Sequence, residues 1–193
     1  MSDFEEKIKR MLKCLEEKIA GKKEKKEINK GIEVCMKQGS RNFENWIQVE
    51  LVAILKENKI FKNDDIRVEA RNHGNADIFI DHLGCEKESI AIEIKVARLG
   101  GKDLSHAVPI GPIKKDIEKL RELKGKRVLL CVAYKADDSF EKSWEGENGY
   151  RKEIERCIKK DELDPKSSPC PSFKVKVEGR DNEVEVLLDY FIF

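Results

Sequence analysis

The segment that most constrains the fold is KRVLLCVAYKA, which spans residues 126–136. Between its charged ends it is an almost unbroken apolar run, without the polar–apolar alternation of a strand that has one face in water. Such a run is typical of a strand buried on both faces at the centre of a sheet. The segment therefore predicts a layered protein built around one central sheet.

The spacing of apolar residues and the positions of capping and turn residues predict the helices and strands around this strand. Apolar positions at helical spacing predict helices over 3–20, 31–38, 43–58, 112–124 and 149–160. Asn42 is the expected N-cap of the third of these, and Pro112 suits the first turn of the fourth. Strands are predicted over 66–70, 76–80 and 89–97, a proline-broken loop over 164–172, and a closing hairpin over 173–193.

This order indicates an α/β protein with a central mixed sheet flanked by helices. A length of 193 residues suits a single domain over 1–193. We expect a helical N-terminal extension at 1–41 and a core at 42–136. A C-terminal helix and hairpin at 137–193 would complete the domain.

Composition gives only broad limits on function. Lys and Arg total 39 and Asp and Glu total 38, so the formal net charge is +1, which neither indicates nor excludes a nucleic-acid partner. No apolar run approaches the ~18 residues of a membrane helix. The N-terminus is charged from Asp3, unlike a secretory leader. We expect a cytoplasmic protein with reduced cysteines and no membrane partner.

Three charged residues interrupt the most strand-like part of the chain, residues 76–96. Strand alternation places Glu93 and Lys95 side by side on one face, among small residues. If strands 76–80 and 89–97 form a hairpin, Asp77 lies opposite Glu93. Two carboxylates and one ammonium would then converge at one point of the sheet.

Such a cluster needs compensation, because facing like charges destabilise a sheet and buried carboxylates are costly. A divalent cation supplies it, and Mg²⁺ prefers carboxylate oxygens together with water and phosphate. Glu50 lies near the middle of the apolar face of the helix predicted at 43–58, and is a third candidate acid.

Each of these residues also has a purely structural interpretation. Asp77 could cap the turn predicted at 71–75, and Glu50 could pair with an arginine. Glu93 and Lys95 could be solvated charges on an edge strand. These alternatives stay open for each residue alone, whereas the combination on successive elements favours a shared site.

Glu50 on a helix, Asp77 on a strand and Glu93-Ile94-Lys95 on the next strand resemble the signature of the PD-(D/E)XK nuclease superfamily. The restriction endonuclease-like core of that superfamily is helix, three strands, helix, strand, an order that matches residues 43–135 here. The resemblance does not cover the flanks of the chain.

The resemblance implies metal-dependent hydrolysis of a nucleic-acid phosphodiester, with Mg²⁺ as cofactor and Mn²⁺ as a substitute. It implies that Asp77, Glu93, Glu50 and the backbone carbonyl of Ile94 hold the metal. Lys95 would position the attacking water. Asp77, Glu93, Lys95 and Glu50 are thus the expected catalytic set.

The chain departs from the superfamily pattern at two places. Ala76 stands where the superfamily is named for a proline. The helix predicted at 112–124 lacks the Gln and Tyr pair of the RecB-like exonuclease branch, so an endonuclease is the expected activity. Asp81, on the same strand face, is a rival for the first acid; Asp77 is preferred because its neighbours are apolar and it faces Glu93.

Basic residues that follow the motif are candidates for binding phosphates of DNA, the expected nucleic acid. They are Arg98, Lys102, Lys114 and Lys115, each of which could equally be an ordinary surface charge. The leading hypothesis is an endonuclease of the restriction, repair or phage-defence type. The alternative is an inactive nuclease-like module that binds DNA or a protein. A homodimer through the first 40 residues is a further hypothesis.

Overall fold

The structure is a computed structural model that describes part of the chain. It covers residues 2–20, 40–61, 65–70, 76–81, 88–99, 110–135, 150–159, 166–167, 172–175 and 184–193. The helix expected at 31–38 and the turn expected at 71–75 lie outside these residues.

The described elements follow the predicted order. The helices are α1 (Asp3–Ala20), α3 (Ser40–Glu57), α4 (Ile110–Arg121) and α6 (Tyr150–Lys159). The strands are β1 (Asp65–Ala70), β2 (Ala76–Asp81), β3 (Ile90–Leu99), β4 (Lys126–Lys135), β5 (Lys166–Ser167), β6 (Phe173–Val175) and β7 (Val184–Ile192).

The structure corrects three of these predictions in detail. Helices α3 and α4 begin at Ser40 and Ile110, two residues before the expected Asn42 and Pro112, although Pro112 lies in the first turn of α4, as predicted. A single-sequence pattern locates the centre of a helix better than its first turn, where propensities are weak. The predicted loop at 164–172 contains the short strand β5, which exists because it pairs with the end of β7.

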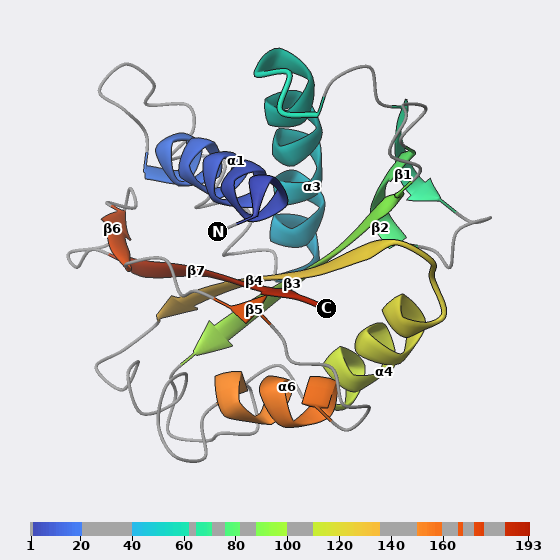
Figure 1. The fold of residues 1–193 in the computed structure, drawn as a ribbon. Helices are drawn as coiled ribbons and strands as arrows, with labels where there is room; N and C mark the ends of the chain where they lie inside the picture. The colour runs from blue at the N-terminus through green and yellow to red at the C-terminus, as the bar shows by residue number, and fades with distance from the viewer. Residues whose placement is uncertain are drawn as a thin grey trace.

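The sheet is mixed, with the order β1-β2-β3-β4-β7-β5 and with β6 also paired to β7 (Figure 1). Strands β3 and β4 are parallel, and the other pairs are antiparallel. The parallel pair is joined through α4, because parallel neighbours need a crossover connection. The predicted pairing of the C-terminal hairpin is confirmed by the β6–β7 register.

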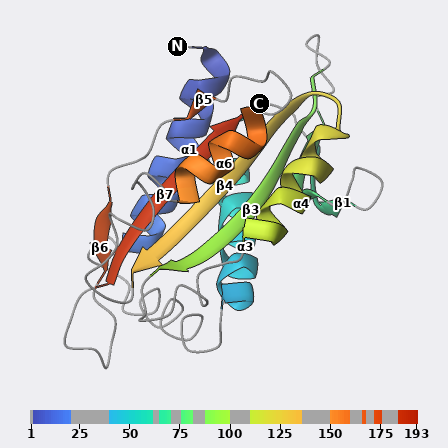
Figure 2. The same cartoon turned by 90° about the horizontal axis from the view of Figure 1, so that it is seen from below.

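β4 is the buried central strand that its sequence predicts. It lies between β3 and β7, as the view onto the face of the sheet shows (Figure 2). Its residues from Val128 to Tyr134 are all buried. Cys131 is among them, as expected for a core thiol.

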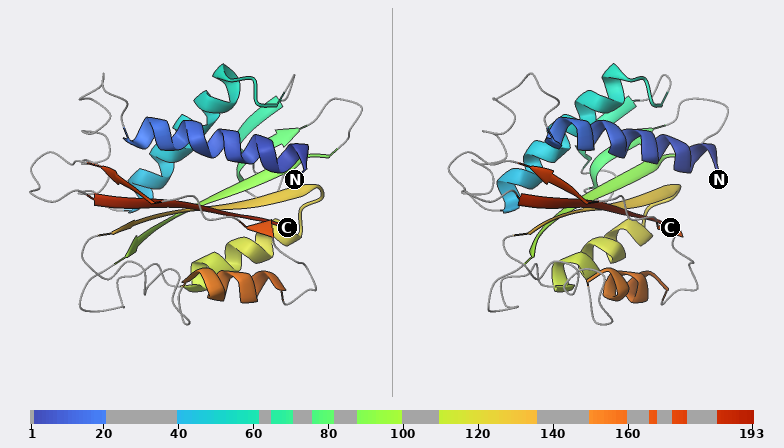
Figure 3. Two further views of the ribbon diagram at one scale, coloured as in Figure 1. Left: turned by 60° about the vertical axis from the view of Figure 1, so that its left-hand side comes forward. Right: turned by 90° about the vertical axis from the view of Figure 1, so that its left-hand side faces the viewer.

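Helices cover both faces of the sheet and make a three-layer α/β/α arrangement (Figure 3). α1 and α3 lie on one face, and α4 and α6 lie on the other. A salt bridge connects α4 and α6, in which Lys114 Nζ lies 3.2 Å from Glu153 Oε1. Arg121 of α4 also donates hydrogen bonds to the carbonyl oxygens of Cys157 and Ile158.

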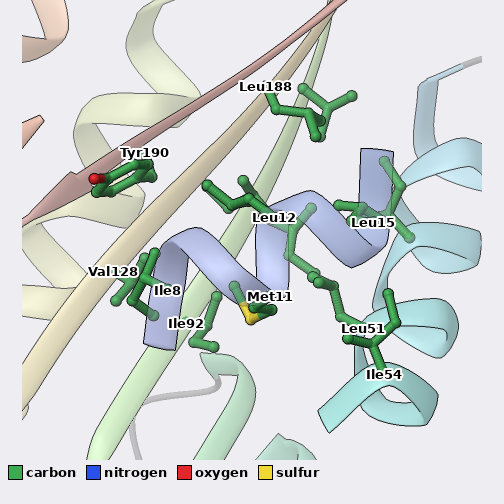
Figure 4. Close-up of a cluster of buried hydrophobic side chains, with 14 of the residues drawn as sticks. Ile8, Met11, Leu12, Leu15, Leu51, Ile54, Ile92, Val128, Leu188 and Tyr190 are labelled. Carbon is green, nitrogen blue, oxygen red and sulfur yellow. The ribbon is translucent and has the colours of Figure 1, made fainter. Parts of the chain in front are cut away.

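The larger hydrophobic core lies between the sheet and the α1–α3 pair. Figure 4 shows Ile8, Met11, Leu12 and Leu15 of α1 packed among side chains of α3 and of the strands. α1 is therefore an integral part of this core. Within the described part of the chain, no helix is long and apolar enough to span a bilayer.

Gly125, which precedes β4, has a positive φ of 98° and lies against Ser89. A Cβ there would overlap the carbonyl oxygen of Ser89, the acceptor of the Lys126 N–H at 2.9 Å. We expect Gly125→Ala to lower the free energy of unfolding by about 1–3 kcal/mol. Urea denaturation tests this. Gly111→Ala is the control, because nothing lies within 4 Å of its Cβ position; equal midpoints for both variants would contradict the prediction.

Candidate active site

The candidate site lies where β2 and β3 cease to pair. The last paired residues at this end are Ile78 and Ile92. One further step in the same register sets Asp77 opposite Glu93, which agrees with the hairpin predicted from the sequence. From there β3 runs on beside β4, and within the described residues no strand pairs with its other edge beyond Ile92.

Side chains provide partners for the main chain at this opening. Oδ2 of Asp77 accepts a hydrogen bond from the backbone N–H of Ile94 at 2.7 Å. The side-chain amide of Gln48, on α3, donates to the carbonyl oxygen of Asp77 at 2.6 Å. These contacts satisfy polar groups that have left the β2–β3 ladder. They also fix the Asp77 carboxylate in front of β3.

Glu93 is almost completely buried, with 2% of its surface exposed. Its Oε1 lies 3.7 Å from Lys95 Nζ, and its Oε2 lies 2.8 Å from Lys119 Nζ on α4. Burial, together with the neighbouring Asp77 carboxylate, raises the pKa of Glu93 from 4.5 to about 7. The Lys119 ammonium opposes that rise. Glu93 thus changes charge near neutral pH.

Lys95 joins residues from helices on both faces of the sheet. Its Nζ lies 2.9 Å from Glu44 Oε1 on α3 and 3.2 Å from Asp116 Oδ2 on α4. In the described part of the chain, the pairing of β3 with β2 ends at Ile92, before Lys95. Burial alone lowers the pKa of Lys95, but these carboxylates and Glu93 outweigh it and hold that pKa above its usual value. Lys95 is therefore a cation at neutral pH, and not a base.

Six charged residues meet at this opening, and we call them the acid–lysine cluster. They are Glu44, Asp77, Glu93, Lys95, Asp116 and Lys119. Asp77 belongs to the cluster through electrostatic coupling to Glu93. Burial raises the pKa values of the Asp77 and Glu44 carboxyls, and the Ile94 N–H and the Lys95 ammonium, respectively, oppose this. Four carboxylates thus face two ammonium groups.

The structure does not bring Glu50 into this cluster. Its Oε2 lies 3.7 Å from Lys18 Nζ of α1. α3 packs against both the sheet and α1, so its apolar arc is wider than one face, and an acid inside that arc can face either neighbour. Glu44, which the sequence analysis did not select, is the α3 acid that contacts Lys95.

The other candidates fall at different places. Asp81 lies 3.7 Å from Arg67 of β1 and is partly exposed, which favours Asp77 as the first acid. Lys114 pairs with Glu153, and Lys115 is exposed on α4. The Arg98 side chain and the whole of Lys102 lie outside what the structure describes.

The sequence analysis did not identify Glu44, Asp116 and Lys119 as site residues. Each lies in a helix whose sequence has an ordinary amphipathic pattern. Glu44 and Gln48 are four residues apart on α3, and Asp116 and Lys119 are three apart on α4. Such spacings put two side chains on one helix face. The sequence signal that could have identified them is a pair of polar residues at this spacing, next to the apolar stripe of the helix.

The carboxylate oxygens of the cluster are suitable ligands for a hard cation, although in this structure they pair with lysines. Carboxylate oxygens are the ligands that Mg²⁺ and Mn²⁺ prefer. Glu93 Oε2 is buried, and the Lys119 ammonium lies 2.8 Å from it. Among the described residues, no group of three or more His, Cys, Asp or Glu side chains is arranged as a ready metal site.

We expect Glu93→Gln to raise stability at pH 8 in the presence of a chelator. The pKa of Glu93 is raised on folding, so the folded state holds its proton at pH values where the unfolded chain has released it. Wild-type stability therefore falls as the pH rises from 4.5 through about 7. The neutral amide avoids this loss, which is about 1–3 kcal/mol.

Urea denaturation at pH 5 and pH 8 checks this prediction, and the gain should shrink towards zero at pH 5. Glu118→Gln on the exposed side of α4 is the matched control, with an expected change within about 0.5 kcal/mol at both pH values. A Glu93→Gln variant less stable than wild type at pH 8 would contradict the argument.

The chain matches no family model, no curated protein and no solved structure.

Proposed function

We propose that the protein is a metal-dependent nuclease that hydrolyses phosphodiester bonds, with DNA as the expected substrate. The observation that carries the proposal is the meeting of Asp77, Glu93 and Lys95 where β2 and β3 separate. Placing a buried carboxylate beside a second, partly buried one costs stability, and such arrangements are concentrated at functional sites.

The order of elements supports the same proposal. The succession α3, β1, β2, β3, α4, β4 is the helix, three strands, helix, strand order of a restriction endonuclease-like core. The three central residues of the site lie on the second and third of these strands. We propose this finer fold assignment together with the activity.

In the proposed mechanism, Asp77 and Glu93 would hold the metal ion, and the Ile94 carbonyl would be a backbone ligand. Glu44 takes the role that the resemblance gave to Glu50, because it is the α3 acid beside Lys95. A bound Mg²⁺ supplies Lewis-acid activation of water and offsets phosphate charge.

Lys95 supplies the remaining chemistry through its position and its charge. Its ammonium is held by Glu44 and Asp116, and it can donate hydrogen bonds to an attacking water or to a phosphate oxygen. Lys114 and Lys115 in the first turns of α4, with Arg98 and Lys102 before that helix, are the proposed contacts to the DNA backbone.

A nuclease-like module that binds DNA or a protein without cutting is the second candidate. One observation favours it: both lysines of the acid–lysine cluster already pair with carboxylates, so the cluster is internally compensated. Such a module would retain DNA with or without a divalent metal and would leave it intact.

The test is cleavage of circular, linear and single-stranded DNA, and of an RNA oligomer, with Mg²⁺, Mn²⁺ or EDTA. Asp77→Asn should lose both saturable Mn²⁺ binding and cutting. Asp81→Asn, a matched change on the same strand face, should keep both. Metal-independent DNA retention without cutting would favour the binding module. Equal losses in the two variants would contradict the assignment of Asp77.

A further inference from the structure

We propose that Lys119 is an internal counter-cation that competes with a divalent metal ion for the Glu93 carboxylate, and so sets the metal affinity of the site. This inference rests on the proposed function, since it assigns Glu93 to metal binding. It concerns a residue on α4 that the nuclease signature does not include.

The contact between Lys119 and Glu93 is the closest that Glu93 makes to either lysine. The two side chains approach to 2.8 Å, whereas Lys95 lies 3.7 Å from the other oxygen of Glu93. Glu93 is buried, so water can do little to solvate the charge of its carboxylate. Lys119 therefore supplies the positive charge that this carboxylate needs when no metal is bound.

Lys119 is also placed so that it can leave. Its side chain is 25% exposed, which gives the ammonium a route to water. Asp116, one turn earlier on α4, lies 3.7 Å from Lys119 and offers a second partner. A lysine has a flexible stem and a compact charge, so its ammonium can move without any change in the helix.

If Lys119 competes with the metal, its removal should lower the stability of the metal-free protein and raise the metal affinity of the site. Without Lys119, the metal-free protein keeps a buried carboxylate that has lost its nearest cation, so its stability falls. The same loss makes the site more negative, so a divalent cation binds more tightly. A lysine with only a structural role would lower stability without tightening metal binding.

The experiment measures Mn²⁺ binding by electron paramagnetic resonance for wild type, Lys119→Met and Lys124→Met. Met keeps the length of the side chain and removes its charge. We expect Lys119→Met to bind Mn²⁺ about 5- to 100-fold more tightly than wild type. Its metal-free melting temperature should also be lower. Lys124, which is exposed just beyond α4, is the matched control and should change neither value.

The outcomes separate this inference from the proposed function. Wild type that binds Mn²⁺ no less tightly than Lys119→Met would overturn the inference and leave the nuclease proposal standing. Binding by Lys119→Met alone would support the inference. An absence of binding in both, with both folded, would overturn the inference and the metal-dependent function together.

A second measurement uses wild type only, in case Lys119→Met does not fold. Reductive methylation followed by peptide mass spectrometry reports how accessible each lysine amine is. Saturating Mn²⁺ should raise the modification rate of Lys119 several-fold and leave Lys124 unchanged. An unchanged rate at Lys119 would overturn the inference, because the ammonium would then not have been displaced.

Discussion

We expect Lys95→Ala to lower the metal-dependent cleavage rate by about 10²–10⁴-fold. Lys95 is the one lysine of the acid–lysine cluster that lies on the same strand as Glu93, two residues along, where both side chains face the opening. Removal of its ammonium takes away the group that we propose for orienting water and stabilising charge on the phosphate. Single-turnover cleavage of the preferred DNA substrate measures the effect.

Metal binding distinguishes a catalytic loss from a damaged site. Lys95→Ala removes a positive charge beside Glu93, so Mn²⁺ affinity should be kept or increased while cleavage falls. Glu44 and Asp116 lose their shared partner in this variant, so circular dichroism must show that it remains folded at the assay temperature. Lys152→Ala, on the exposed side of α6, is the control. Cleavage by Lys95→Ala at the wild-type rate would refute the proposed role.

The second large effect is expected two strands away from Lys95, at the contact between α6 and β7, where Asp189 pairs with Cys131 and Cys131 pairs with Lys95. Asp189 is completely buried, and its Oδ2 accepts a hydrogen bond from Arg151 Nε at 3.0 Å. Its Oδ1 accepts one from the Tyr190 N–H at 2.9 Å. Arg151→Ala leaves this buried carboxylate without the guanidinium, and we expect a loss of about 3 kcal/mol in the free energy of unfolding.

A double-mutant cycle tests whether the loss comes from the charge. Arg151→Met with Asp189→Leu removes both partners and should recover most of the stability, because an apolar pair can replace a buried ion pair. Arg156→Ala is the control on the same helix, since its exposed pair with Glu153 should contribute no more than about 0.5 kcal/mol. Urea denaturation gives the values for wild type, the single variants Arg151→Met and Asp189→Leu, the double variant and the Arg156→Ala control. A large loss in Arg156→Ala, or none in Arg151→Ala, would contradict the prediction.

This second contact matters for the proposed function as well as for stability. α6 packs against α4, and α4 carries Asp116 and Lys119. An α6 that loses its anchor on β7 would loosen the helix that holds half of the acid–lysine cluster. Reduced cleavage in Arg151→Ala would therefore be an indirect effect.

The strands could be predicted from sequence because their patterns are set by two-residue alternation and by burial. The β2–β3 register followed from the expectation of a simple hairpin between the two strands with its turn near Gly84-Cys85, which sets Asp77 opposite Glu93. The observed pairing of Ile78 with Ile92 agrees with that register. β5 was missed because two residues carry no period of their own, and only their pairing with β7 defines them.

The helical part of the candidate site could not be predicted as well. A helical wheel shows which residues share a face, but it does not say which neighbour that face meets. On a helical wheel the neighbours of Glu50 are apolar, yet its side chain lies beside Lys18 of α1. Glu44 contacts Lys95 instead, because the first turns of α3 pass the open edge of β3. Only the crossing of α3 over the sheet decides between the two acids.

The hydrogen bond from the Ile94 N–H to the Asp77 carboxylate gives the site a natural spectroscopic reporter. A backbone amide that donates to a carboxylate senses the charge on that group, because charge-assisted hydrogen bonds are short and strong. In a ¹⁵N-labelled sample, the Ile94 resonance should therefore follow ligand occupancy and protonation at Asp77. Hydrogen exchange at the same amide would report how often the hydrogen bond between Ile94 and Asp77 opens.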